Sequence, residues 1–337
     1  MKFEKYKNNP VLSANENNEW ESLGVLNPAV CYEGGQFIML YRAAGHDKEH
    51  VIRLGKAVSD DGIHFKRCSD KPFFAPLPYE ADAGCVEDPR LIKIGNCYYM
   101  TYASRLFAPG QYWKQDNKPT YTPPQICPRA VAENSTVTHI AYTYDFKTFK
   151  KLGRMTDSRF DNRDVMIFPE SVGGRYVMLS RPLEWKGEEY GTYAPSMWIT
   201  FSDDMLEWNH CEPQLLAKPE QKWESKKIGA SCPPIKTEQG WLLIYHGVDK
   251  EDGVYRVGAM LLDLDDPTKI TARTREPLME PEFDYELNGF YKGCVFPTAA
   301  VKFEEKLYIY YGASDKYCCL ATCNFNELIE YLVNNCK

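Results

Sequence analysis

The chain has 337 residues and a formal net charge of −7, and 14% of its residues are aromatic, among them 23 Tyr and 7 Trp. The acidic balance argues against a nucleic-acid partner, which needs a basic surface, and the aromatic content excludes a disordered chain. Because no apolar run reaches 18 residues, we expect no membrane-spanning segment. Residues 1–20 lack the apolar stretch of a secretory signal, which favours a cytoplasmic protein.

Twelve cysteines occur without any C-x-x-C pair, and Cys318 and Cys319 are adjacent. Several others lie in apolar, strand-like runs, where a reduced cysteine behaves as a small buried apolar residue. We therefore expect free thiols rather than a disulfide framework. The spacing of His, Cys and Asp residues also predicts no metal site.

Five similar strands recur along the chain, each preceded by a Gly-rich or charged turn. They read GGQFIMLYRA (34–43), IGNCYYMTYA (94–103), GGRYVMLSRP (173–182), EQGWLLIYHG (238–247) and EEKLYIYYGA (304–313). Repetition at such a long period is typical of propellers and arrays. Aligning the strands places five residues at one equivalent position, where a propeller would bring them to its central axis: Arg42, Tyr102, Arg181, His246 and Gly312.

A proline-containing motif precedes each repeated strand, at a position where a strand edge needs no backbone donor. The prolines mark positions 28, 89, 169, 234 and 297, so the steps are 61, 80, 65 and 63 residues. Behind each strand follows a second element, and in four of the five an Asp marks a tight turn. About four short strands fit in each unit, as in a propeller blade.

The pattern predicts an all-β protein, a five-bladed β-propeller that forms a single domain over residues 1–337. A β-sandwich or two separate β domains are the alternatives. The long second step contains an irregular stretch at about 105–139, which we interpret as a functional insertion loop. Near the end of the chain, Leu328, Ile329 and Leu332 form a helical stripe, so a short helix is expected over Phe325–Asn335.

Seven motifs in order resemble glycoside hydrolase family 130 over about residues 10–332. They read EDPR (87–90), NRD (162–164), LSRP (179–182), KIGAS (227–231), GWLLIYHGV (240–248), YRVGAMLLDLDDP (255–267) and YYGASD (310–315). The resemblance implies a five-bladed propeller and an inverting phosphorylase of β-mannosides, with inorganic phosphate as co-substrate and no further cofactor. A branch of the family hydrolyses β-1,2-mannosides instead.

The resemblance assigns Asp88, in the D-P-R motif, as the general acid, and implies that its proton passes through a sugar hydroxyl. Inverting transfer needs such an acid and a nucleophile on the opposite face of the sugar, and phosphate is already an anion. On the residues alone, Asp88 would be read as a turn cap that pairs with Arg90. The neighbouring Glu87 is expected to raise the pKa of Asp88 and to contribute to substrate binding.

The same resemblance assigns the phosphate to Arg163, Arg181 and His246, with Lys227 and Tyr255 close by. Arginine suits bidentate binding of an oxyanion, and a histidine that is protonated near neutral pH adds a donor. The alternative for each arginine is a surface ion pair, and for Tyr255 a packing role in a strand.

Sugar recognition is expected from Asn27, Arg42 and Asp315, with Asp47 as a weaker candidate. Carboxylates and guanidinium groups bond paired sugar hydroxyls. Asp315 matches the mannose-binding aspartate of the family. Three aromatics of the insertion are candidates for stacking on the acceptor sugar: Tyr112, Trp113 and Tyr121.

Two other functions remain open at this point. An inverting hydrolase would need a carboxylate base about 6.5–9.5 Å from Asp88, for which Glu224, Glu276 and Glu280 are candidates. A lectin-like propeller would bind sugar without turnover. The segment 289–298 and the long insertion depart from the β-1,4-acting members, so the linkage and the acceptor cannot be read. The habit of the family favours a homo-oligomer acting on a small carbohydrate.

Overall fold

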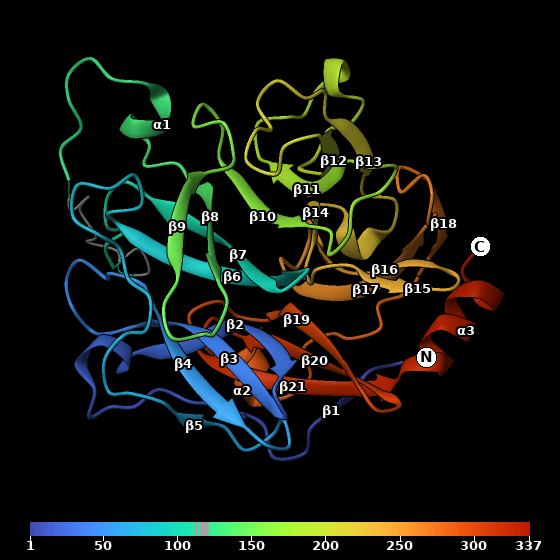
Figure 1. Cartoon of the computed structure of the whole chain (residues 1–337), viewed down its shortest axis with the longest axis horizontal. Coiled ribbons are helices and arrows are strands. Elements are labelled where there is room, and N and C mark those ends of the chain that lie inside the picture. Colours follow the sequence, from blue (N-terminus) through green and yellow to red (C-terminus); the bar gives the residue numbers. More distant parts are fainter. Residues whose placement is uncertain (112–113, 115–120) are drawn as a thin grey trace.

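A computed structural model describes residues 1–111, 114 and 121–337, and it is a five-bladed β-propeller (Figure 1). Five antiparallel sheets surround a central cavity, and the first strand of each sheet is the innermost one. The first blade contains β2 (Gly24–Glu33), β3 (Gln36–Ala44), β4 (Arg53–Ser59) and β5 (Lys66–Arg67). The second contains β6 (Cys85–Ile94), β7 (Cys97–Arg105), β8 (Val137–Thr143) and β9 (Lys150–Arg154).

The third blade contains β10 (Asn162–Ile167), β11 (Tyr176–Pro182), β12 (Met197–Ser202) and β13 (Gln214–Ala217). The fourth contains β14 (Lys227–Ala230), β16 (Gly240–Val248), β17 (Tyr255–Leu262) and β18 (Ile270–Arg273), with β15 (Ile235–Thr237) also paired to β16. The fifth contains β19 (Val295–Phe303), β20 (Lys306–Ala313), β21 (Tyr317–Asn324) and, from the other end of the chain, β1 (Glu4–Lys5). The prediction of a five-bladed propeller is confirmed.

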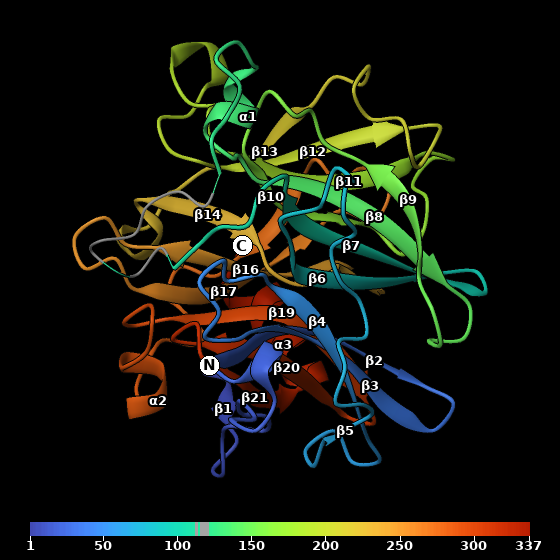
Figure 2. The ribbon, with the colours of Figure 1, turned by 90° about the vertical axis from the view of Figure 1, so that its left-hand side faces the viewer.

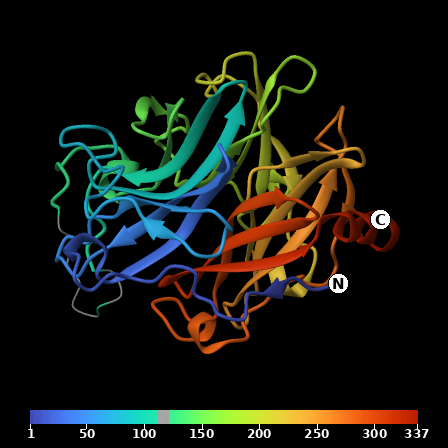
Figure 3. The same cartoon turned by 60° about the horizontal axis from the view of Figure 1, so that its bottom comes forward.

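The fifth blade closes the ring, because β1 pairs with β21 and both termini lie at one edge of the molecule (Figures 1 and 3). With β1 as its fourth strand the fifth blade is complete, and β21 continues into α3 (Phe325–Asn335), the helix expected from the sequence. The side chain of Asn324 caps α3 by accepting a hydrogen bond from the backbone N–H of Glu327 at 3.1 Å. Within the described ranges, no helix is long and apolar enough to cross a bilayer.

The apolar core is divided among the contacts between neighbouring blades. One cluster joins Leu40 of the first blade to Met100 of the second, and another joins Leu179 of the third to Leu243 of the fourth. Further clusters fill the remaining three contacts around the ring. All twelve cysteines lie in described parts of the chain, and none forms a disulfide.

The repeated strands of the sequence are the second strands of the blades, but the predicted alignment was wrong by one residue in the second blade. There, Ile94 of β6 pairs with Cys97 of β7, so the turn consists of Gly95 and Asn96. Counting from this turn, the residue of the second blade that is equivalent in position to Arg42, Arg181, His246 and Gly312 is Ala103 and not Tyr102. The reason is that Ile94 is the last residue of β6, so the turn begins one residue later than the sequence pattern indicates.

Tyr102 instead shares its register with Tyr41, Tyr245 and Tyr311, and each of these tyrosines belongs to an intrablade tie. An intrablade tie joins the tyrosine of a second strand to a buried carboxylate before the first strand and a cation from the fourth strand. The four ties are Tyr41–Glu21–Arg67, Tyr102–Asp82–Lys151, Tyr245–Glu224–Arg273 and Tyr311–Glu286–Lys5. Three carboxylates lie on short helical turns: η1 (Glu19–Glu21), η3 (Lys222–Glu224) and α2 (Asp284–Leu287).

Bulges in the innermost strands turn polar side chains toward the axis. The register shifts between Leu26 and Ala29, between Glu87 and Arg90, and between Arg163 and Met166. In the three bulges, Asn27, Asp88 and Asp164 take positive φ angles of 45°, 51° and 55°, a conformation that Asn and Asp tolerate better than most residues. Two prolines, Pro28 and Pro89, occupy the bulges, where no ladder donor is needed.

The predicted insertion separates β7 from β8, and its described part contains α1 (Arg129–Ala132). Figures 1 and 2 place α1 outside the sheets, on the side away from the fifth blade. The other short elements are η2 (Glu188–Tyr190), in the loop between β11 and β12, and the helices named above.

Candidate active site

A cavity of about 570 Å³ lies on the propeller axis, where the bulged inner strands and the ends of the second strands meet. It is lined by ten residues that the sequence assigned to catalysis, phosphate or sugar: Asn27, Arg42, Glu87, Asp88, Arg163, Arg181, Lys227, His246, Tyr255 and Asp315. Residues far apart in the sequence therefore come together as the repeat predicts. Their individual roles remain predictions.

Asp88 lies at the centre of the cavity, with 24% of its side chain exposed. Its Oδ1 accepts hydrogen bonds from Asn27 Nδ2 at 2.8 Å and from Arg42 Nη1 at 2.9 Å. Burial alone would raise the pKa of Asp88, but the charges of Arg42 and Arg90 and these hydrogen bonds lower it below its ordinary value. The other oxygen stays available to a ligand.

Glu87 does not act on Asp88 as the sequence predicted. Arg42 Nη1 lies 3.0 Å from Glu87 Oε2 and thus bridges the two carboxylates, and Arg105 Nε lies 3.7 Å from Glu87 Oε1. The expectation that Glu87 raises the pKa of Asp88 is wrong, because the cation between them outweighs the neighbouring negative charge.

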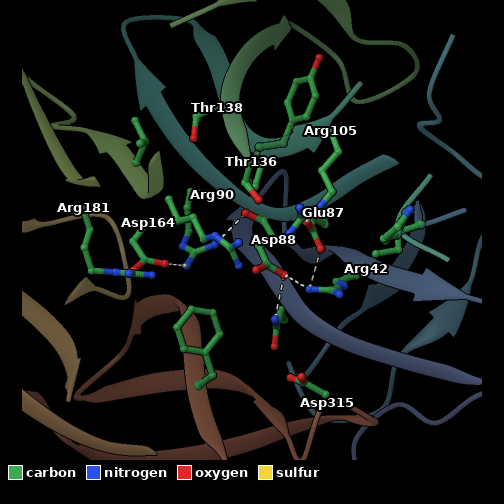
Figure 4. A pocket seen from close by; sticks show the side chains of 18 of the residues that line it. Arg42, Glu87, Asp88, Arg90, Arg105, Thr136, Thr138, Asp164, Arg181 and Asp315 are labelled. Atoms are coloured by element: carbon green, nitrogen blue, oxygen red, sulfur yellow. Dashed lines mark hydrogen bonds and ion pairs between the residues drawn. The ribbon is translucent and has the colours of Figure 1, made fainter. Parts of the chain in front are cut away.

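On one side of Asp88, a second group of charges forms around Asp164 (Figure 4). Arg181 Nε donates to Asp164 Oδ2 at 2.5 Å, and His246 Nε2 lies 3.6 Å from the same oxygen. Arg90 extends between this group and Asp88: its Nη1 donates to the backbone oxygen of Asp88 at 2.7 Å, and its Nη2 lies 4.0 Å from Asp164 Oδ1.

Three buried nitrogens around Asp164 have no hydrogen-bond partner within the described part of the chain: Arg90 Nη2, Arg181 Nη1 and His246 Nε2. A buried donor without a partner is costly, and such groups in native proteins usually await a ligand or a water molecule. The three donors all belong to residues that line the cavity. This side of the cavity is therefore suited to an oxyanion.

His246 differs from the expectation of a protonated donor. Burial lowers the pKa of His246 to about 3, and the nearby charge of Arg181 adds to the effect while Asp164 opposes it. The ring is therefore neutral near neutral pH. Because its Nδ1 lies 3.1 Å from the hydroxyl of Ser231, the neutral ring can accept there and donate from Nε2 toward the cavity.

Two further cations border the same side. Arg163 is 38% exposed and forms a bidentate pair with Asp161, with Nε–Oδ1 at 2.7 Å and Nη2–Oδ2 at 2.9 Å. Lys227 Nζ donates to the hydroxyl of Tyr255. Burial, helped by the charge of Arg181, lowers the pKa of Lys227 to about 7, so an arriving anion would favour its protonated form.

Figure 4 shows Asp315 below Asp88, whereas Asp164 lies to the left of Asp88. The backbone of Asp315 has a positive φ of 55°, and burial raises the pKa of its carboxyl group, an effect that Arg42 opposes and Asp88 reinforces. A carboxyl group held in this way, within reach of the charge of Arg42, can bond the hydroxyls of a sugar.

Two glycines make room for this arrangement. A Cβ on Gly229 would lie 2.4 Å from Asp164 Oδ2, 2.7 Å from His246 Cε1 and 2.9 Å from Arg181 Nε. A Cβ on Gly312 would lie 1.8 Å from Asn27 Oδ1, and Asn27 orients Asp88. Gly312 therefore serves the site by its lack of a side chain.

Sequence reasoning missed Arg90 and Asp164 as site residues, although both stand in motifs that it singled out, EDPR and NRD. For Asp164 the available signal was its place in the repeat, because it occupies the same bulge position as Asn27 and Asp88. Arg90 follows the general-acid candidate by two residues. Of the weaker candidates, Tyr121 lines the cavity and stacks on Phe107 at a centroid distance of 4.3 Å. Tyr112 and Trp113 lie outside the described residues.

Several other candidates lie away from the cavity. Asp47 is not among the residues that line it and accepts a hydrogen bond from the backbone N–H of Val51 at 3.3 Å. Glu224 is buried in an intrablade tie, and Glu276 and Glu280 are exposed outside the cavity. None of these three glutamates is placed to act as the base of a hydrolase. Among the described residues, no group of His, Cys, Asp or Glu side chains could hold a metal ion.

Comparison with known proteins places these features in a family. The sequence profile of glycoside hydrolase family 130, described as beta-1,4-mannooligosaccharide phosphorylase, matches residues 3–334. The 1,2-beta-oligomannan phosphorylase and the beta-1,2-mannobiose phosphorylase of Thermoanaerobacter sp. (strain X514) are each 37% identical to the chain, over 94% of it and 95% of the relative. The beta-1,4-mannooligosaccharide phosphorylase of Ruminococcus albus is 31% identical, over 97% and 90%.

Solved structures give the same result. The complex of beta-1,2-mannobiose phosphorylase from Listeria innocua with beta-1,2-mannobiose is 26% identical and superposes with a TM-score of 0.79, over 98% of this chain and 99% of that one. A structure described with glycoside hydrolases of the family that target beta-1,2-mannosidic linkages in Candida mannan gives 26% identity and a TM-score of 0.76, over 96% and 94%. The chain belongs to glycoside hydrolase family 130.

Proposed function

We propose that this protein is an inverting β-mannoside phosphorylase, which uses inorganic phosphate to release α-mannose 1-phosphate from a mannosyl oligosaccharide. The single observation that carries the proposal is the set of three unpartnered buried donors on Arg90, Arg181 and His246, in the cavity that Asp88 also lines. A hydrolase needs to place a water molecule and a base at this position, whereas a phosphorylase needs donors for an anion.

In the proposed reaction, phosphate bound to these donors attacks the anomeric carbon from the face opposite the leaving group. A bond forms between a phosphate oxygen and that carbon, and the glycosidic bond to the acceptor oxygen breaks. Asp88 supplies the proton that the acceptor oxygen gains, through a sugar hydroxyl as the family resemblance implies. One displacement inverts the configuration from β to α.

The low pKa of Asp88 fits this role once phosphate is bound. Arg42 and Arg90 keep the free carboxyl group ionised. Phosphate beside Arg90 would offset part of the positive charge and raise the pKa of Asp88, since a nearby anion disfavours ionisation. Proton uptake by Asp88 is thus expected to follow phosphate binding, which couples the acid to the presence of the nucleophile.

The sugar at the cleaved bond is expected to contact Asp315, Arg42, Glu87 and Asn27. All four line the cavity; Arg42 pairs with both Glu87 and Asp88, and Asn27 donates a hydrogen bond to Asp88. Fixed, paired polar groups of this kind reject sugars that lack a matching hydroxyl.

For the linkage we favour β-1,2 over β-1,4. The supporting argument is the similarity to the two Thermoanaerobacter phosphorylases, which are named for β-1,2-linked substrates and share 37% of their residues with the chain, against 31% for the β-1,4 relative.

The test is to incubate the protein with β-1,2- and β-1,4-mannobiose, with and without phosphate, and to follow the products by ³¹P and ¹H NMR. We expect α-mannose 1-phosphate, preferentially from the β-1,2 substrate, and no turnover without phosphate. Full release of mannose in phosphate-free buffer would overturn the proposal in favour of a hydrolase. Binding of either disaccharide without any turnover would favour a lectin-like protein.

A further inference from the structure

Asp164 is an unusual residue for an anion site, because it brings a negative charge among the donors. Its Oδ2 is 2.5 Å from Arg181 Nε and 3.6 Å from His246 Nε2, and its Oδ1 is 4.0 Å from Arg90 Nη2. The position that a Cβ of Gly229 would take lies within 3 Å of Asp164, His246 and Arg181 together. An anion held by these donors therefore has to lie close to the carboxylate.

Asp164 is fixed in this place. It occupies the bulge of β10 with a φ of 55°, and its side chain is 6% exposed and lines the cavity. Although burial alone would raise its pKa, the charges of Arg181 and Arg90 and the hydrogen bond from Arg181 hold the pKa of Asp164 well below its usual range. The carboxylate is thus ionised and can only accept a hydrogen bond.

Holding Arg181 requires only one of the two carboxylate oxygens. Oδ2 receives the hydrogen bond from Arg181 Nε, whereas in the described part of the chain no side chain donates a hydrogen bond to Oδ1, and Arg90 Nη2 lies 4.0 Å from it. The second oxygen is therefore left for a donor that arrives with the ligand.

The chemistry of the ligand supplies that donor. Two unprotonated oxyanions repel each other at contact distance, but a hydroxyl hydrogen between them turns the contact into a charge-assisted hydrogen bond. Inorganic phosphate keeps at least one P–OH group near neutral pH, whereas sulfate has no hydrogen to donate. We propose that Asp164 is a specificity-determining residue, which accepts a hydrogen bond from the P–OH group and thereby selects a protonated tetrahedral oxyanion. This inference rests on the proposed phosphorolysis and deepens it.

The first test uses the unaltered protein and four tetrahedral anions, measured by isothermal titration calorimetry without any sugar. Phosphate and arsenate carry a hydroxyl group, whereas sulfate and monofluorophosphate match them in shape and charge but have none. We expect the first pair to bind about 10- to 100-fold more tightly than the second, because a buried carboxylate facing an anion without a proton is left unpaired. Equal affinity for phosphate and sulfate would overturn the inference.

The second test is Asp164→Asn, whose side chain tolerates the positive φ and keeps an oxygen for Arg181. The new amide can donate to an anion, so the preference for phosphate over sulfate is expected to fall by about 10-fold or more. Glu184→Gln is the matched control: Glu184 lies in the same blade, contacts the backbone N–H of Asp161 at 3.1 Å and does not line the cavity. It removes the same charge and should leave the preference unchanged.

The outcomes separate this inference from the proposed function. If phosphate supports turnover but the preference is unchanged in Asp164→Asn, or falls equally in Glu184→Gln, the role of Asp164 is refuted and phosphorolysis stands. If none of the four anions binds, both are refuted. Should Asp164→Asn fail to fold in thermal denaturation, the comparison of the four anions on the unaltered protein decides the question.

Discussion

The third blade differs from the other four in where its charged side chains lie and with which residues they pair. Each of the other blades joins a tyrosine, a buried carboxylate and a cation in an intrablade tie. In the third blade, Ser180 takes the place of the tyrosine, as the register beside Arg181 shows. Instead, Asp161 pairs with Arg163 and Asp164 pairs with Arg181, and both arginines line the cavity.

This difference indicates a division of functions among the copies of the repeated unit: four blades contain a stabilising tie, and the third supplies charged residues of the site. The ties connect the segment before the first strand of a blade to the second and fourth strands, and apart from Tyr102 their residues do not line the cavity. The third blade omits this connection and places two ion pairs on the wall itself, where they orient Arg163 and Arg181. Substitutions in the site should therefore affect turnover, and substitutions in the ties should affect stability.

The strongest test of this division is Asp88→Asn in the second blade. Asparagine tolerates the positive φ of this position and can still accept from Asn27 and Arg42, but it has no proton to give. We expect kcat to fall about 1,000-fold, as is typical for loss of a general acid, with little change in thermal stability. Turnover that remains near the wild-type value would refute the assignment of Asp88 as the acid.

The opposite result is expected from Arg273→Met in the fourth blade. The substitution leaves Glu224 buried without its cation, which typically costs about 3–5 kcal/mol of unfolding free energy. Because neither residue lines the cavity, kcat per folded molecule should stay unchanged. Urea denaturation and active-site titration measure the two quantities separately.

Lys222→Met is the matched control for this tie. Lys222 lies two residues from Glu224 in η3 and pairs with Glu251 in full contact with solvent. An exposed pair contributes little, so no measurable loss of stability is expected. An equal loss in both variants would show that Arg273 stabilises the blade by something other than its charge.

A smaller effect is expected from Gly229→Ala, which tests how closely the third and fourth blades meet. The added Cβ would lie 2.4 Å from Asp164 Oδ2, so the carboxylate and with it Arg181 must move. A displacement of this size at the phosphate donors should lower kcat/KM for phosphate about 100-fold. Gly24→Ala serves as the control, because its nearest neighbour would be at 3.5 Å, an ordinary contact, and activity should be preserved.

The sequence predicted the blades more easily than the site, for physical reasons that individual residues show. The repeated strands carry apolar residues with a turn before each, so local composition marks them, and α3 contains the apolar stripe that predicts it. Arg181 and His246 could be placed together because the repeat puts them at one register position.

Asp164 and the state of His246 could not be predicted in this way. The role of Asp164 depends on a bulge and on the absence of a side chain at Gly229, 65 residues later in the chain. The pKa of His246 depends on burial by several blades at once, and that of Asp88 depends on Arg42, which comes from another blade. Such properties arise only when the ring has closed.

The smallest effect concerns the pH dependence of phosphate binding, to which the fourth blade contributes Lys227. Burial and the charges of Arg181 and Arg163 lower its pKa to about 7, against the opposing charge of Asp164. Below this pH the side chain is a cation and supports anion binding, and above it the charge is lost. By linkage, the affinity for phosphate should fall as pH rises from 7 to 8.5, by about 10-fold. Lys227→Met should bind phosphate weakly at all pH values and lose this dependence, and a pH profile as steep as that of the wild type in this variant would assign the titration to another group.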